Sequence, residues 1–240
     1  MMALADLARL FRFDIPRSLP SQDAYTLWAD SYRAEPHNPL MEIEQSVVIP
    51  MLEAAAPRCA LDVGTGTGRY LPLLAGAGAH VVVGMDLSWA MLTHGSRQTP
   101  LLRGDAARLP FGDARFDLVC SSLMAGDLPD LGPWIREAAR VLEPGGHLVY
   151  SDFHPSWKAE RWRRTFRTAG GQLCEVPFTP HRLEDHLEQL EGAALAVRTV
   201  REPRLAERPA PVVVIIHAVK RGVRPAPRNR LESPNQQARA

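Results

Sequence analysis

The stretch LDVGTGTGRY, residues 61–70, places three alternate glycines and one acid directly after a short apolar run. Glycine permits a positive φ and lets a ligand come close to the main chain. A strand followed by such a loop and then a helix presents free backbone N–H groups and a positive helix end to a polar ligand. Gly64, Gly66 and Gly68 therefore predict the floor of a binding site, and Asp62 supplies a carboxylate just before it.

The region after residue 59 alternates short apolar runs with helix-like segments. HVVVGMD (80–86), FDLVCSS (116–122) and VVVIIHAVK (212–220) are strand-like, and their runs of consecutive apolar residues are typical of strands covered on both faces. Strands separated by helices favour parallel β-α-β units. The sequence therefore predicts an α/β fold with a doubly wound sheet.

Helical spacing of large side chains predicts further elements. Leu4, Leu7 and Phe11 indicate a short N-terminal helix, and Tyr25, Trp28 and Tyr32 share one face of a helix over about 21–33. We expect further helices, the first of them interrupted by Pro50, over about 40–55, 67–76, 131–142 and 180–191, and another that starts near Ser88. The predicted division is an N-terminal helical cap at 1–57, a core at 58–154, a lid or hairpin insert at 155–180, the C-terminal part of the sheet at 181–220 and a disordered tail at 221–240.

Composition excludes several classes of function. The formal net charge is +1, which gives no basic field to gather nucleic acid, and the three cysteines form no C-x-x-C pair that would indicate a zinc site. No apolar run reaches the roughly 18 residues of a membrane span, and the N-terminus has no secretory pattern. We expect a cytoplasmic protein with no metal site, no nucleic-acid or membrane partner, a small-molecule ligand, and either a single subunit or a homodimer.

The glycine spacing separates two classes of nucleotide ligand. A dinucleotide site uses G-x-G-x-x-G for a pyrophosphate, with an acid about 20 residues further on for the ribose. Asp86, at the end of the second predicted strand, supplies such an acid, but the third glycine here comes one residue early. A carboxylate at Asp62 also favours a cation over a phosphate. An NAD-dependent oxidoreductase is therefore the weaker alternative.

These segments resemble the class I S-adenosylmethionine-dependent methyltransferases, in the small-molecule branch that includes quinone-biosynthesis enzymes. LDVGTGTGRY resembles the first motif of that family, and GMDLSWAML resembles the second. LLRGDAARLPF is similar to the adenine-contacting segment, FDLVCSS to the fourth strand, and REAARVLEPGGHLVYSDF to the helix, turn and fifth strand that follow. The resemblance covers about 61–153 in the order of the family, and it implies a mostly parallel, seven-stranded Rossmann-like methyltransferase sheet.

The resemblance implies a role for individual residues toward S-adenosylmethionine. The backbone at Gly64, Gly66 and Gly68 would face the methionyl part, and Asp62 would hold its ammonium group. Asp86 would accept from both ribose hydroxyls. The remaining implied contacts are Leu87 and Ala106 around the adenine, Asp105 at its amine, Ser121 beside the sulfonium, and Tyr25 and Tyr32 on a helix that covers the cofactor.

The implied reaction moves the methyl group to a small-molecule acceptor by in-line displacement, with O-methylation favoured. His154 follows the fifth strand two residues after Asp152, and alternation predicts that both side chains point the same way, as a base oriented by an acid. The arginines of the insert, including Arg163 and Arg164, predict a basic cap over an anionic acceptor. A non-catalytic protein that binds the cofactor and regulates a partner is the remaining alternative.

Overall fold

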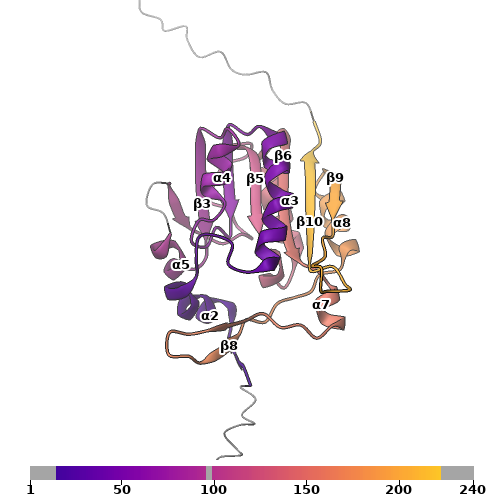
Figure 1. Ribbon diagram of the computed structural model, residues 1–240. Coiled ribbons are helices and arrows are strands. Elements are labelled where there is room, and N and C mark those ends of the chain that lie inside the picture. The colour runs from indigo at the N-terminus through magenta and orange to yellow at the C-terminus, as the bar shows by residue number, and fades with distance from the viewer. Residues whose placement is uncertain (1–14, 96–98, 223–240) are drawn as a thin grey trace, which may run out of the picture.

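The computed structural model describes residues 15–95 and 99–222 (Figure 1). The helix expected around Leu4, Leu7 and Phe11 lies outside the described residues, and so does the expected tail beyond residue 222. Within the described residues, no helix is both long enough and apolar enough to cross a membrane.

The main sheet has seven strands in the order β4-β3-β2-β5-β6-β10-β9. Neighbouring strands from β4 to β6 pair in parallel, whereas β10 is antiparallel to both β6 and β9. The predicted α/β class and mostly parallel seven-stranded sheet are thereby confirmed. The strands are β2 (Cys59–Val63), β3 (Val81–Asp86), β4 (Leu101–Arg103), β5 (Phe116–Ser122), β6 (Leu142–Phe153), β9 (Leu195–Arg201) and β10 (Val213–Lys220).

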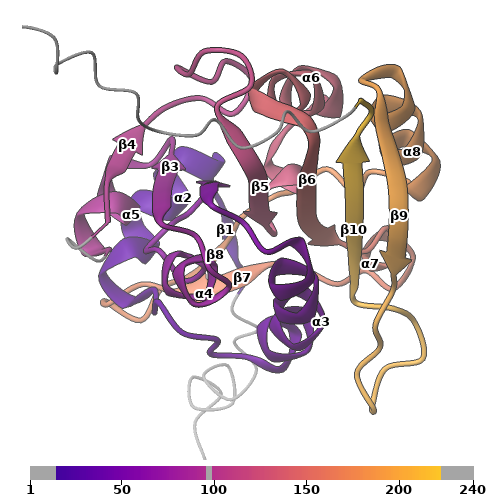
Figure 2. The same cartoon turned by 90° about the horizontal axis from the view of Figure 1, so that it is seen from above.

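Helices cover both faces of this sheet, as Figure 2 shows from above. On one face, α6 (Leu131–Val141) and α8 (Leu183–Gly192) pack on a core that includes Val119 of β5. On the other, α3 (Pro39–Ala55) and α4 (Leu71–Gly76) pack on a core that includes Leu118. Adjacent residues of β5 thus point to opposite cores, as the period of a strand requires. The fold is doubly wound.

The helix α3 differs from the sequence-based expectation, because it continues through Pro50 without a break. Its start is well defined, since Asn38 Oδ1 accepts from the backbone N–H of Met41 at 2.9 Å and Pro39 occupies the first turn. Pro50 is exposed. A carbonyl that loses its amide partner on that side can bind water, so the helix tolerates the proline.

The other helices lie near their predicted positions. The expected helix at 21–33 is α2 (Ser21–Trp28) followed by the short 3₁₀ helix η1 (Ala29–Ser31). Ser88 caps α5 (Trp89–His94) by accepting from the N–H of Met91 at 3.3 Å. The helix after the glycine loop begins at Leu71, later than expected, because residues 67–70 form turns.

A small second sheet lies at the carboxyl ends of the parallel strands, together with α2 (Figure 1). The hairpin of β7 (Thr165–Arg167) and β8 (Leu173–Glu175) turns at the glycines 170 and 171, as the sequence predicts, and we call it the lid hairpin. The sequence did not predict the third strand, β1 (Arg17–Ser18), which pairs in parallel with β8. The short helix α7 (Ser156–Ala159) connects β6 to the lid hairpin.

Candidate active site

One cavity of about 580 Å³ lies between the strand ends and the layer formed by α2, η1 and the lid hairpin. In open α/β sheets, ligands bind outside the carboxyl ends of the strands, which is where this cavity is. Eight of the predicted cofactor-binding residues line it: Tyr25, Tyr32, Gly64, Gly66, Asp86, Leu87, Asp105 and Ala106.

The glycine loop follows β2 and has left-handed backbone at each of its three glycines, with φ of +73°, +57° and +92° at Gly64, Gly66 and Gly68. A Cβ on Gly64 would lie 2.5 Å from Cγ of Met124, whereas a Cβ on Gly66 would meet nothing within 4 Å. Gly66 therefore leaves open space on the cavity side, where a ligand can approach the main chain. Gly68 does not line the cavity and serves the turn into α4.

Asp86 holds the glycine loop against the end of β3. Its Oδ2 accepts from the N–H of Gly66 at 2.8 Å, and its Oδ1 accepts from the N–H of Ser88 at 2.7 Å. Burial raises the pKa of Asp86 from its ordinary value, while these backbone N–H groups act in the opposite direction. The carboxylate thus lies at the cavity wall with its position fixed by two neighbouring loops.

Asp62 lies beneath the loop and is 1% exposed. Its Oδ2 accepts from Thr65 Oγ1 at 2.6 Å, and its Oδ1 has no hydrogen-bond partner within the described part of the chain. Burial raises the pKa of Asp62 to about 7. Asp62 does not itself line the cavity, but Gly64 and Gly66 of the same loop do. A buried carboxyl with an unsatisfied oxygen beneath this loop fits a ligand that carries a cation, such as the ammonium group of S-adenosylmethionine.

The far end of the cavity is bounded by the segments after β3 and β4. Leu87 is 42% exposed at this wall, and Ala106 is buried. Asp105 Oδ1 accepts from the N–H of Ala107 at 2.9 Å, which fixes its turn. An apolar pair beside a carboxylate suits an adenine ring with its exocyclic amine.

Comparison with known proteins is in line with a site for S-adenosylmethionine. Residues 61–150 match the family model described as a methyltransferase domain. The demethylmenaquinone methyltransferase of Mycolicibacterium vanbaalenii is 44% identical over 94 residues, which are 39% of this chain and 41% of that protein. That of Streptomyces avermitilis is 37% identical over 114 residues, covering 46% of this chain and 49% of that protein. The chain thus matches less than half the length of these curated relatives.

Solved structures agree on the fold. An S-adenosylmethionine-dependent methyltransferase from Mesorhizobium loti is 24% identical, with a TM-score of 0.57 over 71% of this chain and 96% of that chain. Magnesium protoporphyrin IX methyltransferase from Synechocystis, solved with bound S-adenosylmethionine, is 18% identical, with a TM-score of 0.59 over 92% of this chain and 99% of that chain.

Residues 61–150 thus form a methyltransferase domain, and the chain has the fold of S-adenosylmethionine-dependent methyltransferases. The family resemblance inferred from the motifs, and S-adenosylmethionine as its cofactor, are thereby confirmed.

Ser121 is not where the family resemblance implied. It is buried, its hydroxyl has no partner among the described residues, and it does not line the cavity of the methyltransferase domain. Ser122 lines the cavity instead. Adjacent strand residues point to opposite faces of the sheet, so an assignment shifted by one residue places the hydroxyl on the wrong face.

The structure does not show Asp152 and His154 paired with each other, and neither lines the cavity. His154 Nε2 lies 2.9 Å from Oε1 of Glu202, its Nδ1 accepts from the N–H of Ser156 at 3.1 Å, and it does not line the cavity. The strand β6 ends at Phe153, so the alternation that predicted a shared direction stops before His154.

Asp152 has a structural role. It is fully buried, and its Oδ1 accepts from the N–H groups of Gly126 at 2.9 Å and Phe153 at 2.8 Å. Burial raises its pKa to about 8. The side chain therefore fixes the turn after β5 from behind and does not reach the cavity.

Two buried ion pairs were not predicted, and the first, which lines the cavity, involves Asp127. Tyr25 donates its hydroxyl to Asp127 Oδ2 at 2.7 Å, and the Arg164 guanidinium pairs with Asp127 Oδ1. Arg164 Nη1 also donates to the Tyr25 hydroxyl at 3.0 Å. Burial acts to lower the pKa of Arg164, but Tyr25 and Asp127 outweigh it and raise that pKa, so the guanidinium stays charged.

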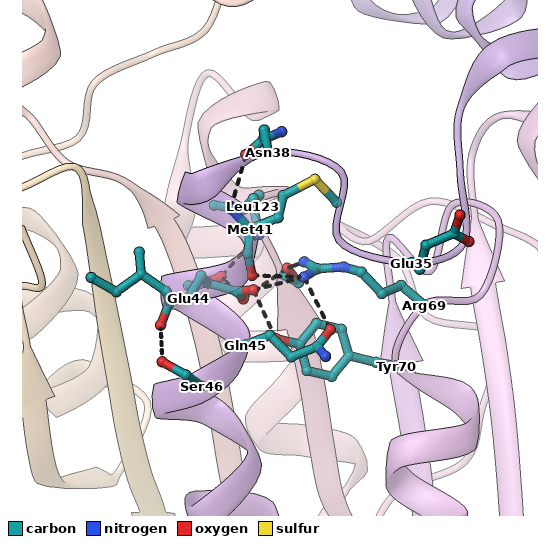
Figure 3. A network of polar contacts seen from close by, with 12 residues as sticks. Glu35, Asn38, Met41, Glu44, Gln45, Ser46, Arg69, Tyr70 and Leu123 are labelled. Atoms are coloured by element: carbon teal, nitrogen blue, oxygen red, sulfur yellow. Dashed lines mark hydrogen bonds and ion pairs between the residues drawn. The ribbon is translucent and has the colours of Figure 1, made fainter. Parts of the chain in front are cut away.

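The second ion pair, shown in Figure 3, joins α3 to the glycine loop. Glu44 is fully buried, and its Oε2 lies 3.0 Å from Nη1 of Arg69 and accepts from Tyr70 at 2.8 Å. Its Oε1 accepts from the hydroxyls of Ser122 at 2.9 Å and Ser151 at 2.7 Å. The sequence signal that could have identified Glu44 is its position, four residues from Leu40 and from Val48, which puts an acid on the buried face of α3.

Aromatic side chains form much of the remaining wall. Trp28 stacks on Phe166 of the lid hairpin with ring centroids 4.7 Å apart, and its edge meets Tyr32 at 5.0 Å. Phe153 and Trp157 also line the cavity, with centroids 4.9 Å apart. Aromatic side chains therefore surround the Tyr25–Asp127–Arg164 group beneath the lid hairpin, and Arg163 and Arg167 also line the cavity.

Proposed function

We propose that the protein transfers a methyl group from S-adenosylmethionine to a small aromatic acceptor of the quinone, hydroquinone or phenol type. The observation that carries this proposal is the single cavity in which the glycine loop and Asp86 face an aromatic compartment under the lid hairpin. The matched relatives named demethylmenaquinone methyltransferase support a quinone-type acceptor.

The cofactor would lie along the strand ends. Backbone at Gly64 and Gly66 would approach its methionyl part, and Asp62 would attract its ammonium group through the orphan oxygen. Asp86 would accept from the ribose hydroxyls, which its two oxygens suit. Leu87, Ala106 and Asp105 would surround the adenine. When bound, S-adenosylmethionine supplies an electrophilic methyl carbon on a positively charged sulfur.

The protein itself contributes alignment and exclusion of water. Tyr32 and Trp28 of the N-terminal cap, together with Phe166 of the lid hairpin, close the cavity opposite the strand ends. Holding acceptor and methyl carbon in line can be worth about 7 to 11 kcal/mol of the barrier. No histidine base is needed for this, because the cofactor carries the reactive carbon.

The acceptor would lie among the aromatic side chains, where a flat ring can stack. We propose methylation at oxygen, as expected from the sequence. Product analysis by NMR separates it from methylation at an adjacent ring carbon, because O-methyl and C-methyl protons have distinct chemical shifts.

Calorimetry with S-adenosylhomocysteine and with NAD tests the cofactor. We expect binding of the first at micromolar concentration and none of the second. Turnover with a set of hydroquinones, naphthols and phenols then tests catalysis. Binding without turnover of any acceptor would favour a regulatory protein, and failure to bind S-adenosylhomocysteine at millimolar concentration would overturn the proposal altogether.

A further inference from the structure

The Tyr25–Asp127–Arg164 group places two opposite charges, both buried, in the aromatic compartment of the cavity. The side chains of Asp127 and Arg164 are 13% and 6% exposed. Removing such a pair from water costs several kcal/mol per ion, and well-packed apolar residues of similar volume are often no less stabilising. Stability alone is therefore a weak reason for an ion pair here, and a role toward a ligand is the better explanation.

The position of Asp127 is fixed from two sides. It ends the 3₁₀ helix η2 (Ala125–Asp127), whose Gly126 N–H is held by Asp152 at 2.9 Å. From the cap, Ser21 and Tyr25 donate to its carboxylate at 3.3 and 2.7 Å. The carboxylate thus lines the cavity without freedom to withdraw, while burial raises the pKa of Tyr25 and keeps its hydroxyl protonated.

The charges of Asp127 and Arg164 favour a neutral acceptor over an anionic one. Arg164 is already neutralised by Asp127, so a carboxylate or phosphate acceptor would place a second anion beside Asp127. A neutral hydroxyl can instead donate to Asp127 and accept from Arg164 or Tyr25. The group therefore suits a phenolic or hydroquinone hydroxyl rather than the anionic acceptor expected from the arginine-rich sequence.

We propose that Asp127 removes the proton from the hydroxyl of such an acceptor, and that Arg164 and Tyr25 hold the resulting oxyanion. This inference rests on the proposed function. The O–H bond breaks, its electron pair stays on the acceptor oxygen, and the proton moves to a carboxylate oxygen of Asp127. Nothing is oxidised or reduced, and the guanidinium exchanges one oxyanion for another. An ionised hydroxyl activates both the oxygen and the adjacent ring carbons, so the step serves methylation at either.

The test uses the complex with S-adenosylhomocysteine and chromogenic acceptor analogues, nitrophenols and nitronaphthols, at a pH below their own pKa. Absorbance reports ionisation of the bound probe, and calorimetry in two buffers of different ionisation enthalpy reports the protons released. For the wild type we expect the bound probe to show the absorbance band of its phenolate form. Calorimetry should then show about zero protons released to the buffer, because the proton stays on Asp127. In Asp127→Asn, every ionised probe should release one proton.

A second variant tests the cation. Arg164→Met should weaken the phenolate band about tenfold or more, as expected for loss of a charge-assisted hydrogen bond in a buried site. Matched controls are Glu160→Gln, which removes an exposed acid at the end of α7, and Arg198→Met, which removes an exposed guanidinium on β9. Circular dichroism checks that each variant folds.

Each outcome decides the inference. A wild type that binds the probes un-ionised, binds none of them, or releases one proton for each ionised probe would overturn it, as would an Asp127→Asn variant indistinguishable from wild type. The proposed function fails separately, through absence of S-adenosylhomocysteine binding to the wild type. If that ligand binds equally to wild type and Asp127→Asn, the cofactor site is intact and only the proton transfer is being tested.

Discussion

The two walls of the cavity are built in different ways. The strand-end wall consists of loops that follow β2, β3 and β4, and it is held by hydrogen bonds such as that from Gly66 N–H to Asp86, 20 residues apart. The lid wall consists of α2, η1 and the lid hairpin, and it is held by buried side chains far apart in sequence. Tyr25 and Asp127, for example, are separated by 102 residues.

This difference explains what each wall can do. A wall of backbone N–H groups and flanking acids recognises a ligand whose polar groups are fixed, which suits a cofactor. A wall of side chains on short elements can be changed without disturbing the sheet, which suits an acceptor that varies between relatives. The Glu44–Arg69 pair supports the strand-end wall from outside the cavity, because it ties α3 to the glycine loop. The following experiments separate their contributions.

The largest expected effect is on stability, from Glu44→Ala. The substitution leaves Arg69 buried without its carboxylate and two serine hydroxyls without their acceptor. Breaking a buried ion pair from one side costs about 3–5 kcal/mol. We expect the free energy of unfolding, measured by urea denaturation, to fall by about that amount.

Two further variants interpret that loss. The double substitution Glu44→Leu with Arg69→Met removes both charges and should recover much of the stability, because no unpaired ion remains. Glu53→Ala removes an exposed acid from the same helix and should change little. A loss in the double variant as large as in Glu44→Ala would show that the pair contributes net stability, and the attachment of α3 to the glycine loop would then be stabilising in itself.

The next effect is on the cofactor, from Asp86→Ala. This change removes the acceptor of the Gly66 and Ser88 N–H groups and the proposed ribose ligand. Loss of charged hydrogen bonds of about 1.5–3 kcal/mol corresponds to roughly 10- to 100-fold weaker binding of S-adenosylhomocysteine by calorimetry. Asp105→Ala removes one hydrogen bond within its own turn and the proposed acceptor of the adenine amine, but no contact to the glycine loop, and should weaken binding less. Equal losses would mean that Asp86 does not organise the strand-end wall.

The walls also differ in how far the sequence predicts them. The glycine loop and Asp86 follow from local spacing, because strand, loop and helix are consecutive in sequence, whereas the adenine segment was implied by the family resemblance. Strand alternation did not extend to His154, which lies beyond the last residue of β6. The family resemblance implied Ser121 beside the sulfonium, but Ser122 is the serine that lines the cavity.

The lid wall was only partly predicted. The turn glycines gave the lid hairpin, and the spacing of Tyr25 and Tyr32 gave the covering helix. The partner of Tyr25 could not be found in this way, because nothing local in the sequence relates Asp127 to Arg164 or either of them to α2. The same holds for Glu44. An acid at an inward-facing helical position is explained only by its partner Arg69, which local sequence does not identify.

Acid titration compares the two walls directly. Burial raises the pKa of Asp62 to about 7 at the strand-end wall and that of Asp152 to about 8 behind the lid wall. Both values exceed those of the unfolded chain, so the folded protein binds more protons between about pH 4 and pH 8. Their contribution to stability is complete below about pH 4 and falls as pH rises, by about 1.4 kcal/mol per pH unit for each group still protonated.

Urea denaturation from pH 5 to pH 8 measures this slope. Asp62→Asn should flatten it up to about pH 7, and Asp152→Asn should flatten it up to about pH 8, each relative to wild type. Binding of S-adenosylhomocysteine should tighten as pH rises through 7, because its ammonium group gains an ionised Asp62. An unchanged slope in both variants would show that neither carboxyl is held protonated by burial.

The smallest expected effect is from Arg163→Ala. Arg163 was grouped with Arg164 in the sequence, and both line the cavity, but their surroundings differ. The Arg163 side chain is 49% exposed and pairs with Glu175 across the lid hairpin, so the pair is worth at most about 1 kcal/mol. We expect the KM for an aromatic acceptor and the unfolding free energy to stay near wild type in Arg163→Ala, whereas Arg164→Ala should impair both. If Arg163→Ala raised KM as much as Arg164→Ala, the acceptor would have to extend to the rim of the lid hairpin, and recognition by the lid wall could no longer be assigned to the Tyr25–Asp127–Arg164 group alone.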